Sequence, residues 1–340
     1  MHFRIRNDDH DNSPAYSRDV LESCGNHSVP EYHHSRWQIM EENYIRKKMR
    51  RKIDRLTYHS KNGVEWFSFP ILDQFPFLVN GFSTRIGGIS TGDGGSMNLS
   101  LAREVAMNMN LTEQKCREIF LENHRRLSEA IGYPYDALVF SNQTHTDNIR
   151  VLQDIDRGNG ITRSNEYNDV DGMMTDITGQ ALMTFYADCV PLLIVDPVHK
   201  AIASVHSGWR GTIKGIGSKA VRMMHEVYGS SPKQLVAAIG PSICIDCFEV
   251  SEDVMRAFQE RYDPSIHQKL IRRGRLTESG RQKYHVDLQL ACMENFLMAG
   301  MKKENISLPD ICTSCNVNYL FSHRASHGNR GNEGAVLMLR

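Results

Sequence analysis

The sequence lacks three features that would assign it a partner or a compartment. Lys plus Arg and Asp plus Glu each number 40 among 340 residues, so net charge indicates neither a nucleic-acid nor a membrane partner. The longest apolar runs are only as long as one strand, whereas a membrane helix needs about 20 apolar residues. The N-terminus carries no apolar segment typical of a secretory signal. We therefore expect a soluble, cytoplasmic protein without nucleic-acid or membrane partners, and the oligomeric state stays open.

Cysteine, in contrast, is well represented. In a long chain without an export signal, eight cysteines are more typical of thiols or metal ligands than of a disulfide framework. Four of them form two C-x-x-C pairs, Cys244 with Cys247 and Cys312 with Cys315. One interpretation is a zinc ion shared by both pairs. The separation of 65 positions between Cys247 and Cys312 exceeds the roughly 15–20 of a zinc ribbon, which favours small buried side chains instead.

The composition changes near residue 60. Residues 1–60 are polar, and "IRKKMRRKIDR" at 45–55 carries seven Lys or Arg, which predicts a poorly ordered extension ending in a basic, solvated helix. Residues 65–340 are expected to form a single domain. Strands are predicted at 64–72, 77–84, 190–195 and 235–244, a strand-like run at 201–212, and a strand, loop and strand over 137–152. Helices are predicted at 112–132, 218–229 and 287–301, the last capped by Gly300. Because these elements mix without repeats or regular βαβ alternation, we predict an α+β fold.

Three metal-binding residue types stand at the edges of predicted strands. His145 lies in "SNQTHTD", Cys189 follows "YAD", and His206 ends "ASVH". Catalytic zinc commonly has three protein ligands of His, Cys or carboxylate type and an open fourth position. Fifteen histidines would supply such triples by chance, so the spacing alone leaves buried, hydrogen-bonded histidines as the alternative.

A set of motifs makes the pattern specific. In order they are "GFSTRIGGISTG…MNLS", "NQTHTDNI", "DGMMTDITGQALMTFYADCVPLLIVDP", "SVHSGWRGT", "IGPSICIDCFEV", "DLQLACMENFLMAG", "CTSC" and "FSHRA". Over residues 65–340 the chain resembles the YfiH/FAMIN family, formerly the multicopper polyphenol oxidase or laccase-domain family, whose members are described as purine nucleoside phosphorylases. The sequence departs from the family pattern at Thr144 and Thr146, at Asp246, and at His323.

The resemblance implies a four-layer αββα sandwich with mixed sheets and a catalytic domain over residues 65–340. It also implies a zinc ion held by His145, Cys189 and His206, with copper as a less favoured occupant. The implied reaction is phosphorolysis of adenosine, inosine, guanosine and methylthioadenosine to free base and ribose-1-phosphate or methylthioribose-1-phosphate. Hydrolytic deamination of adenosine is the implied second activity, for which zinc would make a nucleophilic water available near neutral pH.

Two glycine-rich segments suit the phosphate of such a reaction. Ser83 and Arg85 precede several glycines whose amides can approach an anion, and Asn98 follows in the same motif. Arg210 lies just before a predicted helix, where backbone amides favour anions. A plain glycine-rich turn and a helix-capping turn are the structural alternatives.

Catalytic roles are assigned to Asp188, Cys189 and Arg85. Asp188 is adjacent to a proposed ligand, where it would orient the site, shuttle a proton, or accept a hydrogen bond from a ligating histidine. An acid or a Lewis acid near the base would stabilise the departing purine.

Three other functions are compatible with parts of the pattern. A cysteine hydrolase would use Cys189 as nucleophile and His206 as base, and editing of a peptidoglycan precursor is one form of it. A copper polyphenol oxidase would need many paired histidines, and no His-x-His pair lies near the strand motifs. A scaffold would use the basic N-terminal segment, but polar motifs at strand ends favour a site.

Overall fold

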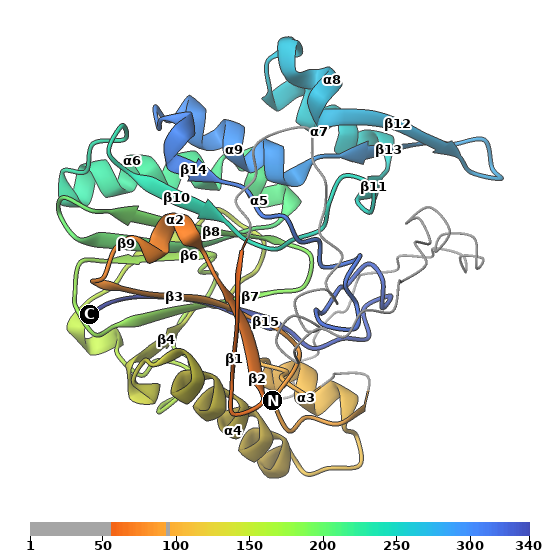
Figure 1. Cartoon of the computed structure of the whole chain (residues 1–340). Coiled ribbons are helices and arrows are strands. Elements are labelled where there is room, and N and C mark those ends of the chain that lie inside the picture. Colours follow the sequence, from red (N-terminus) through yellow and green to blue (C-terminus); the bar gives the residue numbers. More distant parts are fainter. Residues whose placement is uncertain (1–55, 93–95) are drawn as a thin grey trace, which may run out of the picture. The chain divides into compact units, whose positions relative to one another are not determined.

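Residues 56–92 and 96–340 are described by the computed structural model (Figure 1). The predicted basic helix over residues 45–55 and most of the predicted extension over 1–60 lie outside this range. Upstream of the expected boundary near residue 65, Leu56 is buried and strand β1, Thr57–Lys61, pairs with the strand that follows it. The folded domain therefore begins before residue 65.

The first sheet contains six strands in the order β1-β2-β3-β15-β7-β4. Neighbours are antiparallel except β7 and β4, which are parallel, so the sheet is mixed. The last strand of the chain, β15, lies inside this sheet, between β3 and β7. The remaining strands are Val64–Ser68 (β2), Leu78–Ser83 (β3), Leu138–Phe140 (β4), Ala181–Tyr186 (β7) and Glu333–Leu339 (β15).

The second sheet also has six strands, in the order β14-β10-β8-β9-β6-β5. It is mixed as well, because β10 with β14 and β6 with β5 are parallel pairs. Every residue of β8 and β9 is buried, which suits strands covered on both faces. The strands are Ile149–Val151 (β5), Gly172–Thr175 (β6), Val190–Asp196 (β8), Ala201–Ser207 (β9), Val236–Ile239 (β10) and Ile306–Ser307 (β14).

The two sheets pack face to face and helices cover their outer faces (Figure 1). Strands β7 and β15 contact β9, and one apolar core joins Leu182 and Leu337 of the first sheet to Leu193 and Ile202 of the second. Helix α4 packs on β2 and β3, whereas α6 packs on β9 and α9 packs on β8 and β10. The predicted four-layer αββα sandwich with mixed sheets is confirmed.

Local sequence explains both ends of helix α4. Helix α4 begins after Thr112, whose side chain accepts a hydrogen bond from the Lys115 amide, and ends at Gly132 with a φ of 93°. The helices are Pro70–Asp73 (α2), Leu101–Met107 (α3), Glu113–Ile131 (α4), Trp209–Lys214 (α5), Ile216–Tyr228 (α6), Glu252–Arg261 (α7), His267–Leu270 (α8) and Leu288–Met298 (α9).

Two details differ from the sequence expectation. The strand predicted over 64–72 stops at Ser68, because Pro70 begins the short helix α2 and a proline suits the first helical turn. Helix α9 is capped by Ala299, and Gly300 follows it with a φ of 90°. Gly300 therefore occupies the left-handed position one residue later than predicted.

A small third sheet accompanies the second sheet's helices. It joins β11 (Glu249–Val250), β13 (Gln282–Val286) and β12 (Ile271–Leu276), and α7 packs on β13 while α8 contacts β12 and α9. Short 3₁₀ turns connect other elements, at Tyr135–Ala137, Asp154–Asp156, Pro264–Ile266 and Lys303–Asn305. Among the described helices, none is both long and apolar enough to cross a membrane.

Candidate metal centre

The three residues predicted as metal ligands come together at one end of the second sheet. His145 lies in the loop between β4 and β5, Cys189 immediately precedes β8, and His206 is in β9. The ligand atoms of all three lie within 4.8 Å of one another. Strands β8 and β9 are paired with Pro191 opposite His206, which brings Cys189 to the same strand end. The Cys189 Sγ is 3.7 Å from the His145 Nε2, and the two imidazole centroids are 5.0 Å apart.

Asp171 binds two of these residues, the side chain of His206 and the backbone of His145, although the sequence analysis did not select it. Its Oδ1 is 2.7 Å from the Nδ1 of His206 and accepts the backbone N–H of His145 at 3.1 Å. Its Oδ2 accepts the backbone N–H groups of Thr144 and Thr146. The bond to Nδ1 leaves the Nε2 of His206 for a metal, and a carboxylate on the second nitrogen is typical of ligating histidines.

The close approach of His145 depends on a glycine. A Cβ atom on Gly208 would lie 2.7 Å from the Cδ2 of His145 and 3.3 Å from the Sγ of Cys189. His145 itself has a φ of 65°, a left-handed conformation that histidine adopts more readily than branched residues do. The "HSGWRG" segment thus supplies one ligand, His206, and the space for another.

Electrostatic interactions within the site shift the pKa values of Cys189, His206 and Asp171. Burial acts to raise the pKa of Cys189, but the charge of His206 and hydrogen bonds from His145 and His206 outweigh it and lower the pKa to about 6. Burial acts to lower the pKa of His206, but Cys189 and the bond to Asp171 raise it to about 9. The pKa of Asp171 falls to about 2 despite burial, because His206 and backbone amides favour its charged form. Near neutral pH, Cys189 is therefore a thiolate suited to bind a cation.

We predict that the reactivity of Cys189 toward iodoacetamide distinguishes a metal ligand from a free nucleophile. With metal bound, alkylation should be slow because the thiolate is committed to the metal. After chelation it should be fast above about pH 6 and slow below it, following the thiolate fraction. Peptide mass spectrometry measures the rate at Cys189, with buried Cys116, whose pKa burial raises, as the unreactive control. Rapid alkylation of fully metal-loaded protein would contradict the ligand role.

Asp188 faces a different partner from the one considered from sequence. Its Oδ1 accepts a hydrogen bond from the Thr313 hydroxyl at 2.7 Å, and its Oδ2 accepts the Arg324 amide at 2.6 Å. The carboxylate bound to a candidate ligating histidine is Asp171, and the roles suggested for Asp188 stay predictions. Asp188 instead joins the strand end beside Cys189 to the chain segment 313–324.

Each of the predicted phosphate-binding residues contacts other parts of the protein. The hydroxyl of Ser83 accepts the Gly334 amide, and the Asn98 amide bonds Ser100, Glu104 and Asn332 within the buried interior. Arg85 donates to the Val317 carbonyl at 2.6 Å and lies over the Phe321 ring. Arg210 is exposed and stacks on Trp209 at the start of α5. All four residues stay predictions as phosphate ligands.

Other basic groups, which the sequence analysis did not select, interact electrostatically with Asp188 or with one another. Burial and the charges of Arg330, Arg103 and Arg324 lower the pKa of His323, while Asp188 acts in the opposite direction. Arg330 is in turn influenced by Arg103, Cys189 and Asp188, and its buried Nε has no hydrogen-bond partner in the described part of the chain. These four groups, His323 with Arg103, Arg324 and Arg330, form what we call the basic cluster. His323 and Arg324 lie in the family motif "FSHRA", whereas no local sequence pattern points to Arg103 or Arg330.

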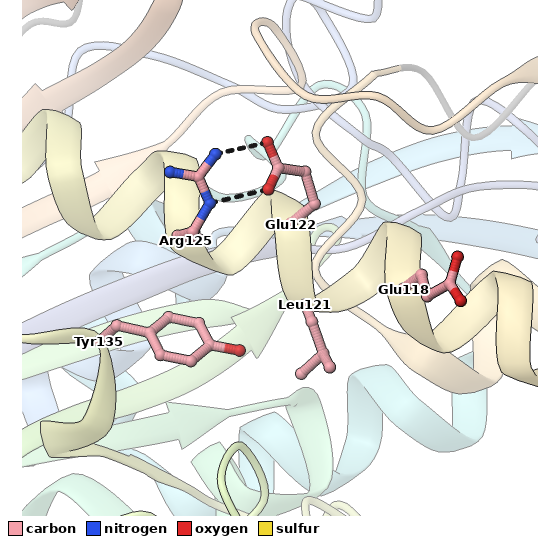
Figure 2. A pocket seen from close by; sticks show the side chains of 5 residues that line it. All are labelled: Glu118, Leu121, Glu122, Arg125 and Tyr135. Carbon is pink, nitrogen blue, oxygen red and sulfur yellow. Dashed lines mark hydrogen bonds and ion pairs between the residues drawn. The ribbon is translucent and has the colours of Figure 1, made fainter.

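Neither of two surface cavities contains the candidate ligands. Figure 2 shows one of about 310 Å³ along α4, where Arg125 and Glu122 form an ion pair of 2.7 Å. A second, of about 320 Å³, is lined partly by Ser141, Phe185 and Asn332. Ser141 begins the loop that carries His145, and Phe185 lies four positions before Cys189. Only the second cavity thus adjoins chain segments that lead to the site.

Together, the fold and this site define a class: two-sheet αββα sandwich proteins with a Cys/His₂ ligand set at the strand ends. The chain belongs to the multi-copper polyphenol oxidoreductase laccase family, whose model matches residues 79–340. This confirms the family inferred from the motifs.

Relatives in sequence and structure agree with this assignment. Purine nucleoside phosphorylase YlmD of Bacillus subtilis (strain 168) is 29% identical over 261 residues, which cover 75% of this chain and 86% of that protein. Adenosine deaminase RL5, from an unknown prokaryotic organism, is 31% identical over 212 residues, covering 62% and 78%. The crystal structure of the Bacillus licheniformis hypothetical protein YfiH superposes with a TM-score of 0.72 at 26% identity, covering 83% of this chain and 99% of that one.

Proposed function

We propose that this protein is a zinc-dependent purine nucleoside phosphorylase with adenosine deaminase side activity. Its substrates would be adenosine, inosine, guanosine and methylthioadenosine, each cleaved by phosphate to free base and the corresponding sugar-1-phosphate. The observation that carries the proposal is the Cys/His₂ ligand set anchored by Asp171, in a chain whose relatives include proteins named for both activities. The catalytic domain would comprise the described chain, including the predicted residues 65–340.

The donor set fits zinc. One thiolate and two imidazoles within 4.8 Å are borderline-soft ligands in the number that catalytic zinc sites use, and a fourth position stays open. A copper polyphenol oxidase would need additional clustered histidines. In residues 56–92 and 96–340, the only other metal-binding group of His, Cys, Asp or Glu consists of four cysteines. The ligand chemistry therefore favours zinc over copper.

Different residues of the chain would have different roles in the reaction. When bound, zinc supplies a Lewis acid that favours negative charge on the leaving purine or on a water. Asp171 fixes the orientation of His206 and of the loop that carries His145. The three arginines of the basic cluster would supply positive charge for a phosphate dianion. Asp188, held by Thr313 and Arg324, would orient the ribose hydroxyls rather than a metal ligand.

One observation favours a cysteine hydrolase as the second candidate. Cys189, His206 and Asp171 form a thiol–imidazole–carboxylate series, and the pKa of Cys189 is lowered to about 6. Cell-wall precursor editing would belong to this class. Such a mechanism does not need His145, whose Nε2 faces the Cys189 thiol at 3.7 Å. The placement of His145 supports the metal centre instead.

The decisive experiment measures base release with and without phosphate. Purified protein is analysed for metal and incubated with each of the four nucleosides, and products are separated by chromatography. We expect base release that requires phosphate and stops on chelation, together with slower conversion of adenosine to inosine without phosphate. A metal-loaded protein that releases no base from any of the four nucleosides would refute the proposal.

A further inference from the structure

Four cysteines outside the Cys189 site gather in one place. Cys244 and Cys247 lie in the loop after β10, and Cys312 and Cys315 lie in the loop after β14. Their four Sγ atoms lie within 4.8 Å of one another. The sequence separation favoured small buried side chains over a shared zinc, but the fold brings both C-x-x-C pairs together. Because β10 and β14 are parallel neighbours, both loops leave the same end of the sheet.

The spacing of the sulfur atoms suits a metal better than a disulfide. Tetrahedral Zn–S bonds of about 2.3 Å place the sulfurs about 3.8 Å apart. The Sγ atoms of Cys247 and Cys315 are 3.5 Å apart, and a disulfide would need about 2.05 Å. No disulfide joins any of the cysteines in the described part of the chain. Four thiols at this spacing form a complete tetrahedral ligand set.

The backbone around the cysteines forms a built site. The N–H groups of Cys247 and Phe248 both donate to the Cys244 carbonyl, which closes a tight turn within the first C-x-x-C pair. The backbone N–H of Cys244 donates to the Sγ of Cys312 at 3.2 Å, a contact that stabilises a thiolate. Asn316 donates to the Cys312 carbonyl at 2.8 Å, and Ser242 pairs with Cys312 in a short β-bridge. Both loops are therefore held in register with each other.

We propose that Cys244, Cys247, Cys312 and Cys315 bind a second, structural zinc ion. Four thiolates close the coordination sphere, so this ion would have no open position for substrate, unlike the three-ligand centre. Cys244 and Cys312 are buried, and Cys247 and Cys315 are half-buried, which keeps water from the ligand set without sealing the entry path. The site is separate from the phosphorolysis proposed above and does not depend on it.

This zinc would also stabilise the positions of Asp188 and Arg324 beside the candidate metal centre. Thr313, within the second C-x-x-C pair, donates to Asp188, and the Arg324 guanidinium donates to the Cys247 carbonyl at 3.1 Å. The Ile243 amide donates to the Asp188 carbonyl at 3.0 Å. The cysteine loops therefore contact the residue that precedes Cys189 from two directions. Loss of the ion would loosen Asp188 and Arg324 as well as the loops.

The test counts metal ions in variants that empty one site at a time. Mass-spectrometric metal analysis should find two zinc ions per wild-type chain, one in Cys247→Ser/Cys315→Ser, and one in His145→Ala/His206→Ala. Cobalt substituted into the histidine variant should show strong thiolate-to-metal charge-transfer absorption. The control Cys116→Ser, a cysteine outside both clusters, should keep both ions. Unchanged metal content in Cys247→Ser/Cys315→Ser would overturn the proposal.

A measurement on wild-type protein covers the case in which the cysteine variant fails to fold. X-ray absorption should then show five sulfur and two imidazole nitrogen ligands shared by two zinc ions. If only one in three zinc ligands were sulfur, as expected for the His145–Cys189–His206 centre alone, the second site would be overturned. A disulfide between the cysteine loops in the isolated protein would also overturn it. Because neither readout uses catalysis, failure of the nucleoside assay would leave this result unaffected.

Discussion

Replacing His145 by alanine is expected to remove the metal from the His145–Cys189–His206 centre and lower kcat/KM for phosphorolysis by more than about 10³-fold. Losing one of three ligands leaves too few donors to retain zinc. Lewis-acid stabilisation is worth several kcal/mol, and each 1.4 kcal/mol corresponds to a factor of ten. His145 is exposed in a loop, so its removal should leave the fold intact. Cys189→Ala and His206→Ala should have the same effect on metal and turnover.

The assay combines zinc content with phosphate-dependent release of hypoxanthine from inosine. His225→Ala is the matched control, since His225 is an exposed histidine on α6 outside the centre, and it should keep both metal and activity. The result for His145 also separates the two candidate mechanisms. A cysteine hydrolase would keep Cys189 and His206 functional without His145, but its reaction would not require phosphate. Near-normal phosphate-dependent turnover in His145→Ala would therefore reject the metal centre, whereas a phosphate-independent hydrolysis that His145→Ala keeps would support the hydrolase.

Replacing Arg330 by methionine is expected to raise the apparent phosphate constant for phosphorolysis by about 10- to 100-fold. The substitution keeps an unbranched side chain but removes the positive charge. A hydrogen bond to a charged group contributes about 1.5–3 kcal/mol, which corresponds to this range. The half-buried Arg330 has an Nε without a partner in residues 56–92 and 96–340, and it interacts electrostatically with Cys189 and Asp188. It is therefore the member of the basic cluster best placed for an anion.

Adenosine deamination provides the internal control for this prediction. Water replaces phosphate as the attacking group in deamination, so Arg330→Met should change that rate less than about threefold. Arg256→Met removes an exposed arginine that pairs with Glu252 on α7, and it should change neither reaction. Arg85→Ala and Arg210→Ala test the phosphate residues predicted from sequence in the same assay. Equal loss of both reactions in Arg330→Met would assign Arg330 a structural role.

Patterns that act within one segment could be predicted from the sequence. Thr112 and Gly132 marked the ends of α4 because capping involves residues adjacent in the chain. The short helix at Pro70 was missed because the apolar run around it also suits a strand. The three metal ligands were found because each lies within a motif of the family, and their geometry followed from strand ends that meet at one edge.

Contacts set by strand pairing could not be read from the chain. Asp171 faces His206 because β6 pairs with β9 so that Gly172 lies opposite Val205, which a single sequence does not reveal. The basic cluster unites Arg103 with residues more than 200 positions later. Thus the sequence by itself determined the family, the fold class and the three candidate ligands. Only the tertiary structure decided that Asp171 orients the centre. It also decided that two cysteine pairs, separated by 65 positions, lie together, because parallel pairing of β10 and β14 brings their loops to one end of the sheet.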